Sequence, residues 1–268
     1  MNDFPSTDPA DILAEKKIFP TDLTTDELRA LDAAVRNESF YSAQTLNEHL
    51  LELYRERIGA ALRGEAPEGH ATTELSQPYI RQSIKELLQE SDYSPAAGEE
   101  GTLKDLSSDA RINLILRTNE DLSMGQGLWM HNQHTALLDE WPGQELFRAE
   151  YREVPRDWLY RWRLAGAQTG DPIGRGWTIT PDNRLIALKN HPIWNWIGSS
   201  ALFKDALDVI WPPFAFNSGM WVRNVDRAET EAIGLLQKGQ AAPRPMSIAN
   251  ALAAFAAKIS ALAQEVEK

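Results

Sequence analysis

The chain has 268 residues, a net charge of −12 at neutral pH and no cysteine. The lack of cysteine excludes disulfides, thiolate zinc sites, iron–sulfur clusters and cysteine nucleophiles at once. Hydrophobic residues make up 43% and charged residues 25%, which is the balance of a folded globular protein. No run approaches the ~20 apolar residues that cross a bilayer, and the first residues lack a signal-peptide pattern, so we expect no contact with a membrane.

Charge and aromatic content both change along the chain. Residues 1–110 carry 22 acidic and 10 basic side chains, whereas residues 111–268 carry 17 of each. All nine tryptophans lie between Trp129 and Trp221. These changes place a boundary of organisation near residues 110–145. The acidic part is either a solvated face that keeps the protein soluble or a surface that meets a basic protein.

The acidic first part is expected to be helical. Thr24 followed by Glu27 is a capping box, in which each side chain satisfies a free backbone N–H of the first helical turn. Residues 43–62 carry apolar side chains three and four apart, and Gly64 follows them as a helix end. Residues 91–107 are rich in Ser, Gly, Pro and Glu, and this composition indicates a linker.

The middle of the chain has the composition of strands. Residues 157–164, 176–180 and 220–225 combine aromatic and β-branched residues with polar ones, which favours β-structure. Residues 200–210 are expected to form a brief helix. Asp226 is expected to cap another helix that starts directly after it.

The final residues carry the clearest periodic pattern. After a proline-rich stretch, Ser247 is expected to cap a helix whose apolar positions step by four and three residues, as in a heptad seam. Such a stripe requires a covering surface, which is either another part of the same chain or a second molecule, a further copy of the chain included. The candidate partner-binding residues are Ile248, Leu252, Phe255, Ile259, Leu262 and Val266.

Together these patterns predict an α+β protein in three parts. Residues 1–107 form an acidic helical region. Residues 108–237 form a small mixed β-containing domain rich in tryptophan, and residues 238–268 form a proline-containing linker and an amphipathic C-terminal helix. The sequence contains no convincing internal repeat.

The sequence offers few residues for chemistry. His131 and His134 lie three apart and would share one face of a helix, so they are weak candidates for metal binding that Glu140 or His191 could complete. However, no His-Glu-x-x-His motif accompanies them. Neither a G-x-S-x-G nucleophile elbow nor a phosphate-binding G-x-x-x-x-G-K-[ST] loop occurs. We therefore expect no catalytic residues, no bound metal and no cofactor.

Nucleic acid is not the favoured partner. Arginines alternate with tryptophans and tyrosines between Arg148 and Trp177, as in surfaces that stack on bases and neutralise phosphates. Acidic residues in and beside the same stretch almost balance these arginines, and stacking of arginine on tryptophan is also ordinary packing on a sheet. Contact with nucleic acid therefore stays open.

The order of several short motifs resembles a known family. A helix with an Arg-Thr-Asn motif is followed by glycines, a tryptophan-rich region, a histidine, and a Pro-Pro pair with a nearby asparagine. The residues that carry this likeness are Arg117, Thr118, Asn119, His191, Pro213 and Asn217. The arrangement, over roughly residues 108–235, resembles the phage minor head proteins, the head morphogenesis family typified by those of phages Mu and SPP1.

The resemblance implies a non-enzymatic structural protein present in few copies, which acts near the portal during head assembly and DNA packaging. Its partners would be portal or capsid proteins, and the matching residues would be structural. It would work in the host cytoplasm during assembly and could end up in the virion. Two alternatives stay open, namely a hydrolase or transferase with a site in the tryptophan-rich domain, and an effector that binds a basic protein through the acidic part.

Overall fold

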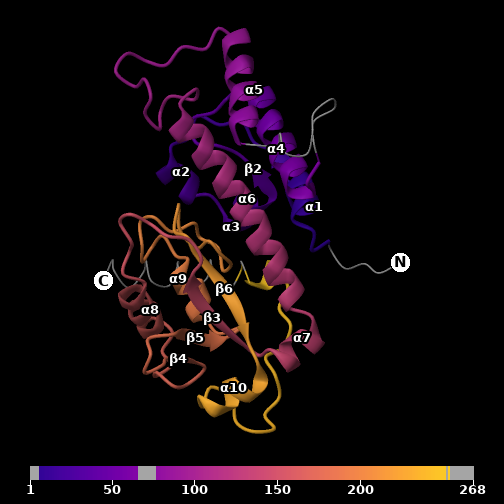
Figure 1. The fold of residues 1–268 in the computed structure, drawn as a ribbon, viewed down its shortest axis with the longest axis vertical. Coiled ribbons are helices and arrows are strands. Elements are labelled where there is room, and N and C mark those ends of the chain that lie inside the picture. The colour runs from indigo at the N-terminus through magenta and orange to yellow at the C-terminus, as the bar shows by residue number, and fades with distance from the viewer. Residues whose placement is uncertain (1–5, 66–76, 252, 254–268) are drawn as a thin grey trace. The chain divides into compact units, whose positions relative to one another are not determined.

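The computed structural model describes residues 6–65, 77–251 and 253 (Figure 1). The chain divides into two compact units, Met1–Gly127 and Leu128–Lys268. The predicted boundary at residues 107 and 108 precedes helix α6 (Asp109–Asn132), whereas this division falls within that helix. Both units contain helices and strands, so the prediction of an α+β protein is confirmed.

The first unit consists mainly of helices around an apolar core. Helix α1 packs against α4, and α4 packs against α5. Phe40, Leu51, Ile58 and Ile84 are among the side chains buried between them. Strands β1 and β2 form one short parallel pair. The elements are α1 (Pro9–Ala14), β1 (Lys17–Ile18), α2 (Thr25–Arg29), α3 (Ala33–Glu38), β2 (Ser39–Phe40), α4 (Glu48–Arg63), α5 (Gln77–Glu90) and most of α6.

Two helix signals predicted for this unit are confirmed. The Thr24 hydroxyl accepts the Glu27 N–H and the Glu27 carboxylate accepts the Thr24 N–H, so the capping box opens α2. Helix α4 ends at Gly64, which has the left-handed φ of 65° that favours glycine. The helix begins later than predicted, because the Asn47 side chain accepts the Leu50 N–H and caps it there.

The segment 91–107, predicted to be a linker, is an ordered loop of the first unit. Tyr93 and Leu106 pack against the core, and the Tyr93 hydroxyl accepts the Leu106 N–H at 2.9 Å. The buried Asp105 carboxylate accepts the N–H groups of Gly101 at 2.9 Å and Ser107 at 2.8 Å. These hydrogen bonds hold the backbone of the loop in a defined conformation, although it contains no helix or strand.

The second unit is built on a four-stranded antiparallel sheet in the order β4-β5-β3-β6. Side chains alternate between the two faces of each strand. One face presents Leu146 and Val222 to helices α8 and α9, and the other presents Ile186 and Val225 to Leu235. The elements are α7 (Thr135–Glu140), β3 (Gly143–Arg148), α8 (Trp158–Ala167), β4 (Trp177–Ile179), β5 (Leu185–Leu188), α9 (Ile193–Ile197), β6 (Met220–Val225) and α10 (Arg227–Ala232).

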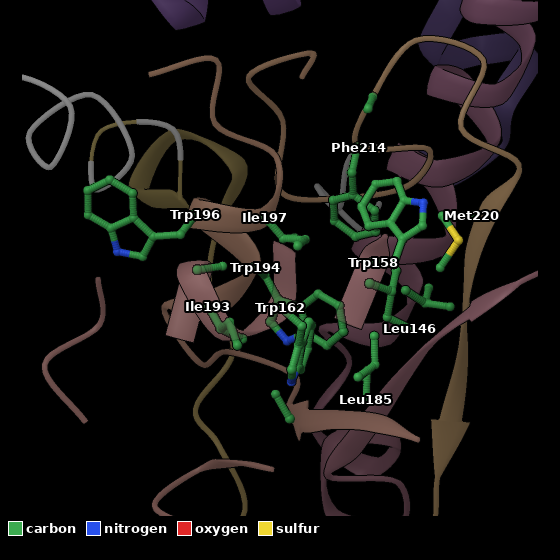
Figure 2. Packing of buried hydrophobic residues seen from close by; sticks show 14 of the residues in the cluster. Leu146, Trp158, Trp162, Leu185, Ile193, Trp194, Trp196, Ile197, Phe214 and Met220 are labelled. Atoms are coloured by element: carbon green, nitrogen blue, oxygen red, sulfur yellow. The ribbon is translucent and has the colours of Figure 1, made fainter. Parts of the chain in front are cut away.

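Tryptophans concentrate in the core between this sheet and its helices (Figure 2). The Trp162 ring lies edge-on to Trp194 at 5.2 Å, and Trp194 stacks on Phe214 at 5.8 Å. The indole N–H of Trp162 donates to the Thr178 carbonyl at 3.1 Å, and that of Trp194 to the Leu188 carbonyl at 2.9 Å. Large rings with satisfied N–H groups therefore join the helices to β4 and β5.

The prediction of a strand at residues 157–164 is wrong, because this stretch begins helix α8. The Asp157 carboxylate accepts the Tyr160 N–H and caps the helix. Trp158 and Trp162, four residues apart, are both buried on its inner face. The aromatic content reflects a buried helical face and not a pleated strand.

Other predictions for this unit have mixed outcomes. The strands at residues 176–180 and 220–225 are confirmed as β4 and β6. The helix predicted at residues 200–210 is wrong, since these residues form turns. The Asp208 carboxylate accepts the Ser200 N–H at 2.7 Å and the Ser200 hydroxyl at 2.8 Å, which closes the segment into a loop.

The described part of the C-terminal helix starts at residue 248. The Ser247 hydroxyl accepts the Asn250 N–H at 3.2 Å, as the predicted cap requires. Ile248 is half-buried, whereas the other predicted partner-binding residues lie outside the described residues, namely Leu252, Phe255, Ile259, Leu262 and Val266. Within residues 6–65, 77–251 and 253, no helix combines the length and apolar character of a membrane span.

Candidate functional site

The Arg-Thr-Asn motif lies inside helix α6 of the first unit. Arg117, Thr118 and Asn119 are all half-buried. The Arg117 Nε atom is 3.9 Å from the Asp121 carboxylate, and the Asn119 side-chain amide donates to the Ile115 carbonyl at 2.9 Å. These contacts stay within one helix, so they stabilise α6 itself.

His191 lies in the second unit, at the start of helix α9, and is buried. Its Nδ1 atom accepts the Ile193 N–H at 3.2 Å, and its Nε2 atom is 3.5 Å from the Asp171 carboxylate. Nδ1 accepts a hydrogen bond, so the ring proton is assigned to Nε2, on the side of Asp171. A Cβ atom at Gly176 would lie 2.6 Å from the ring. The histidine therefore joins the start of α9 to the loop before β4.

Pro213 and Asn217 belong to a loop of unusual backbone conformation that leads into β6. The Pro213 carbonyl accepts the Ser218 hydroxyl at 2.7 Å. Phe214, Asn217 and Gly219 have positive φ values of 63°, 48° and 66°. Such values are strained for residues other than glycine, and strain of this kind clusters at functional sites.

Two arginines fasten the segment after β3 to that strained loop. We call residues 149–157 the arginine-braced loop. The Arg152 Nε atom donates to the Asn217 carbonyl at 3.0 Å. Arg156 donates to the carbonyls of Phe216 at 2.7 Å and Asn217 at 3.3 Å. Asn217 thus contributes through its main chain to a contact between segments about sixty residues apart in sequence.

The Asp205 carboxylate completes this brace. It lies 2.5 Å from Arg156 Nε and 2.7 Å from Arg161 Nη2. Burial alone would raise the pKa of Asp205, but the hydrogen bond from Arg161 and the charges of both arginines hold that pKa below its ordinary value. The Arg161 guanidinium also lies 4.7 Å from the centre of the Phe203 ring. The lowered pKa keeps the Asp205 carboxylate ionised at neutral pH.

The side chains that this loop presents to solvent are apolar and aromatic. Tyr151 is 84% exposed and Val154 is 87% exposed. Tyr160, on the first turn of α8, is 58% exposed. Single exposed apolar residues are common on proteins, but a group of them on a fastened loop marks a candidate interaction surface. These residues, together with the brace, are the candidate functional site.

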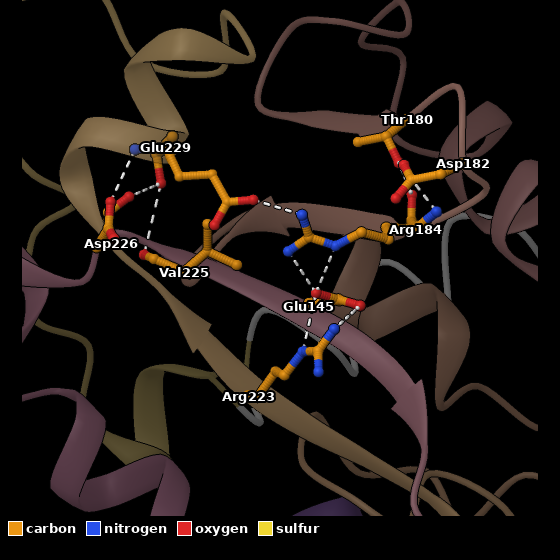
Figure 3. Close-up of polar contacts among 9 residues, drawn as sticks. Glu145, Thr180, Asp182, Arg184, Arg223, Val225, Asp226 and Glu229 are labelled. Carbon is orange, nitrogen blue, oxygen red and sulfur yellow. Dashed lines mark hydrogen bonds and ion pairs between the residues drawn. The ribbon is translucent and has the colours of Figure 1, made fainter.

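A second polar cluster, around Glu145, is structural (Figure 3). Glu145 lies in the middle of β3, where Arg184 Nη2 reaches it at 2.7 Å and Arg223 Nη2 at 2.8 Å. Arg184 also pairs with Glu229 of α10. Burial would raise the pKa of Glu145, but its bonds to the two arginines hold that pKa below its ordinary value. Both carboxylate oxygens of Glu145 are engaged, so it is not available as a base. Arg184, which bonds to both Glu145 and Glu229, links α10 to the sheet.

Lys189, at the end of β5, is a buried amine. It is 3% exposed, and its Nζ atom donates to the Asn132 side-chain oxygen at 3.1 Å. The same oxygen accepts the Asn224 amide at 3.2 Å. Lys189 has no ion pair with any residue that the structure describes, and burial lowers its pKa to about 8. Lysines with such surroundings are the ones that act as nucleophiles or bases in enzymes.

The weak metal candidates His131 and His134 are both exposed. His134 stands at the cap position of α7, but its side chain makes no capping hydrogen bond. In the described part of the chain, no group of three or more His, Asp or Glu side chains is placed to hold a metal ion.

Comparison of the chain with protein-family models, with curated proteins and with solved structures finds no match. Sequence reasoning missed Val154 and Lys189 as site residues, and it considered Tyr151 only among the arginines and aromatic residues weighed for contact with nucleic acid. Arginines four residues apart at positions 148, 152 and 156 are the one local signal of the brace. Nothing local indicates that these arginines turn inward and leave the apolar side chains outside.

Proposed function

We propose that this chain is a non-enzymatic structural protein of a phage, which acts in head assembly and DNA packaging by contacting the portal or the capsid. The likeness of residues 108–235 to the minor head proteins supports this function. The observation that carries it is the arginine-braced loop, which holds Tyr151 and Val154 almost fully exposed on a fastened backbone.

The brace gives the loop the properties of a binding element. Anchors that are ordered before contact lose less conformational entropy when a partner binds. Aromatic and apolar anchors also supply most of the binding free energy in typical interfaces. The carboxylates of Asp205 and Glu145 form ion pairs with arginines of the second unit and stabilise its fold. This favours a structural role over a catalytic one.

Mass spectrometry of purified particles tests this function directly. Proheads and virions would be prepared from host cells infected with the phage that encodes the chain. We expect the protein in proheads in few copies, and its amount in virions will show whether it stays after packaging. Its absence from both kinds of particle would contradict the proposed function.

A second function, a hydrolase or transferase with a site in the tryptophan-rich unit, is favoured by one observation. Lys189 is a buried amine whose pKa is lowered to about 8 by burial. The substitution Lys189→Met separates the two functions. A structural protein keeps its incorporation into particles after this change, whereas an enzyme that uses the amine loses its activity.

A further inference from the structure

The arginines of the braced loop do not face a partner, although they dominate its sequence. Arg152 and Arg156 direct their guanidinium groups at the carbonyls of residues 216 and 217. Arg152 also pairs with Glu150 at 2.8 Å, and Arg156 pairs with Asp205. The positive charge of this stretch is therefore used within the second unit.

The free charges left on the loop are negative. Glu153 is exposed and makes no hydrogen bond or ion pair with any described residue. Asp157 is exposed and accepts the Tyr160 N–H at the start of α8, but it has no ion pair among the residues described. Arg163, further along α8, is exposed and unpaired within the same residues. The loop itself thus combines apolar anchors with two carboxylates, Glu153 and Asp157, that have no ion pair among the described residues.

We propose that the arginine-braced loop docks in an apolar pocket of a partner protein whose rim carries lysine or arginine side chains. Tyr151 and Val154 fill the pocket, and Glu153 pairs with the basic rim. This inference rests on the proposed function and describes the kind of surface that the portal or capsid protein would offer to the chain.

Charge selects this partner over the other classes. Nucleic acid and phospholipid surfaces are anionic and repel the two carboxylates. A second copy of the chain is a poor partner, because residues 1–110 carry a net charge of −12 and residues 111–268 carry none. A basic protein surface with an apolar pocket satisfies both features of the loop.

Binding of the full chain to the purified portal protein and major capsid protein of the same phage tests the proposal. The double variant Tyr151→Ala/Val154→Ala should raise the dissociation constant about 100-fold, as expected for the loss of two interface anchors. Ile173→Ala is the matched control, because Ile173 is 57% exposed in the same unit but lies outside the loop. It should leave the dissociation constant unchanged.

Substitutions of Glu153 test the charged rim. Glu153→Lys should weaken binding more than Glu153→Gln, and added salt should weaken the wild type more than Glu153→Gln. All these side chains are exposed, so unchanged thermal unfolding temperatures will show that the variants are folded.

The possible results separate a failure of the docking inference from a failure of the proposed function. If the wild type binds neither the portal nor the capsid protein, the proposed function fails. If the wild type binds and the double variant binds equally tightly, the function stands and the loop is not the docking element. If the double variant loses binding but Glu153→Lys does not, the basic rim is excluded.

Discussion

Glu145 and Lys189 are both buried in the second unit, but only Glu145 has partners of opposite charge among the described residues. Two arginines bond to Glu145, whereas Lys189 bonds to the oxygen of an amide. A buried group with charged partners keeps its ionised form, and one without them shifts toward the neutral form. At neutral pH the lysine therefore costs the fold stability, and the glutamate does not.

The substitution Lys189→Met should stabilise the protein at neutral pH. The pKa of this lysine falls from 10.5 to about 8 on folding, so the wild type gains stability as the pH rises from about 8 to about 10.5. Below that window the penalty is complete, and removing it is worth up to ~3 kcal/mol of unfolding free energy. Urea unfolding at pH 7 and pH 10 should show the advantage of the variant shrinking at the higher pH.

Lys204→Met is the matched control, because Lys204 is an exposed lysine of the same unit. It should change the unfolding free energy little at either pH. An advantage of Lys189→Met that is the same at pH 7 and pH 10 would contradict the assignment of a lowered pKa to this amine.

Two helical glycines should respond in opposite ways to alanine. A Cβ atom at Gly166 in α8 would lie 2.3 Å from the Trp177 ring, whereas one at Gly59 in α4 would first meet the flexible end of Arg63 at 3.4 Å. Alanine is favoured over glycine in a helix by roughly 1 kcal/mol, so Gly59→Ala should stabilise by up to that amount. Gly166→Ala should destabilise by about 2 kcal/mol, because Trp177 must move. Urea unfolding of both variants measures the difference.

At the scale of an element, the braced loop shows how an irregular segment gains a defined course. Residues 149–157 form no helix or strand, yet their arginines bond to carbonyls of the strained loop that precedes β6. Bonds from charged donors are stronger than those between neutral groups. These bonds therefore fix the course of the loop between strand β3 and helix α8.

Arg156→Leu should release this loop without unfolding the sheet. The change removes the bonds to Phe216 and Asn217 and leaves Asp205 with Arg161 alone. Hydrogen exchange of the amides in residues 149–157 should accelerate at least about tenfold, with a loss of roughly 2 kcal/mol in global stability.

Arg163→Leu provides the control for that experiment, because Arg163 is exposed and has no bonded partner among the described residues. It should alter neither exchange nor stability. Equal exchange rates in the Arg156 variant and the wild type would show that the brace does not order the loop.

The elements that sequence predicted well are those specified by neighbouring residues. The Thr24 box opens α2, Asp226 caps α10, and the pattern of residues 220–225 matches β6. Helix α8 was mistaken for a strand, because its buried tryptophans sit beside polar residues and mimic alternation. Asp157, which caps this helix, is a local helix signal, but the mixture of aromatic and polar residues after it favoured a strand in the prediction.

The candidate site could not be predicted from neighbouring residues, because it depends on contacts between distant parts of the chain. The exposure of Tyr151 and Val154 depends on bonds from Arg152 and Arg156 to carbonyls about sixty residues away. The burial of Lys189 likewise depends on Asn132, on another element. Composition and spacing carry no information on which side chains turn inward at such long range.

At the scale of the whole molecule, acidic charge and tryptophan are separated along the chain. Residues 1–110 hold the entire excess of negative charge, and the tryptophan-rich core belongs to the second unit. A strongly acidic unit stays soluble and repels other acidic surfaces. The two units therefore differ in the net charge that they offer to other molecules.

Removal of residues 254–268 tests whether the predicted heptad stripe meets a partner. This truncation keeps the bonds of the preceding segment, in which the Met246 N–H donates to Gln133 at 3.0 Å. If the stripe binds another molecule, the truncated protein should lose incorporation into proheads while its thermal unfolding temperature stays unchanged. A drop in that temperature with normal incorporation would show that the stripe packs on its own chain.

The confinement of all nine tryptophans to Trp129–Trp221 gives the second unit an optical signal of its own. Indole emission excited near the red edge of absorption originates from the second unit alone, while far-ultraviolet dichroism reports on the helices of both units. Recording both signals along one denaturant titration would therefore show whether the second unit unfolds together with the rest of the chain, with no label and no substitution.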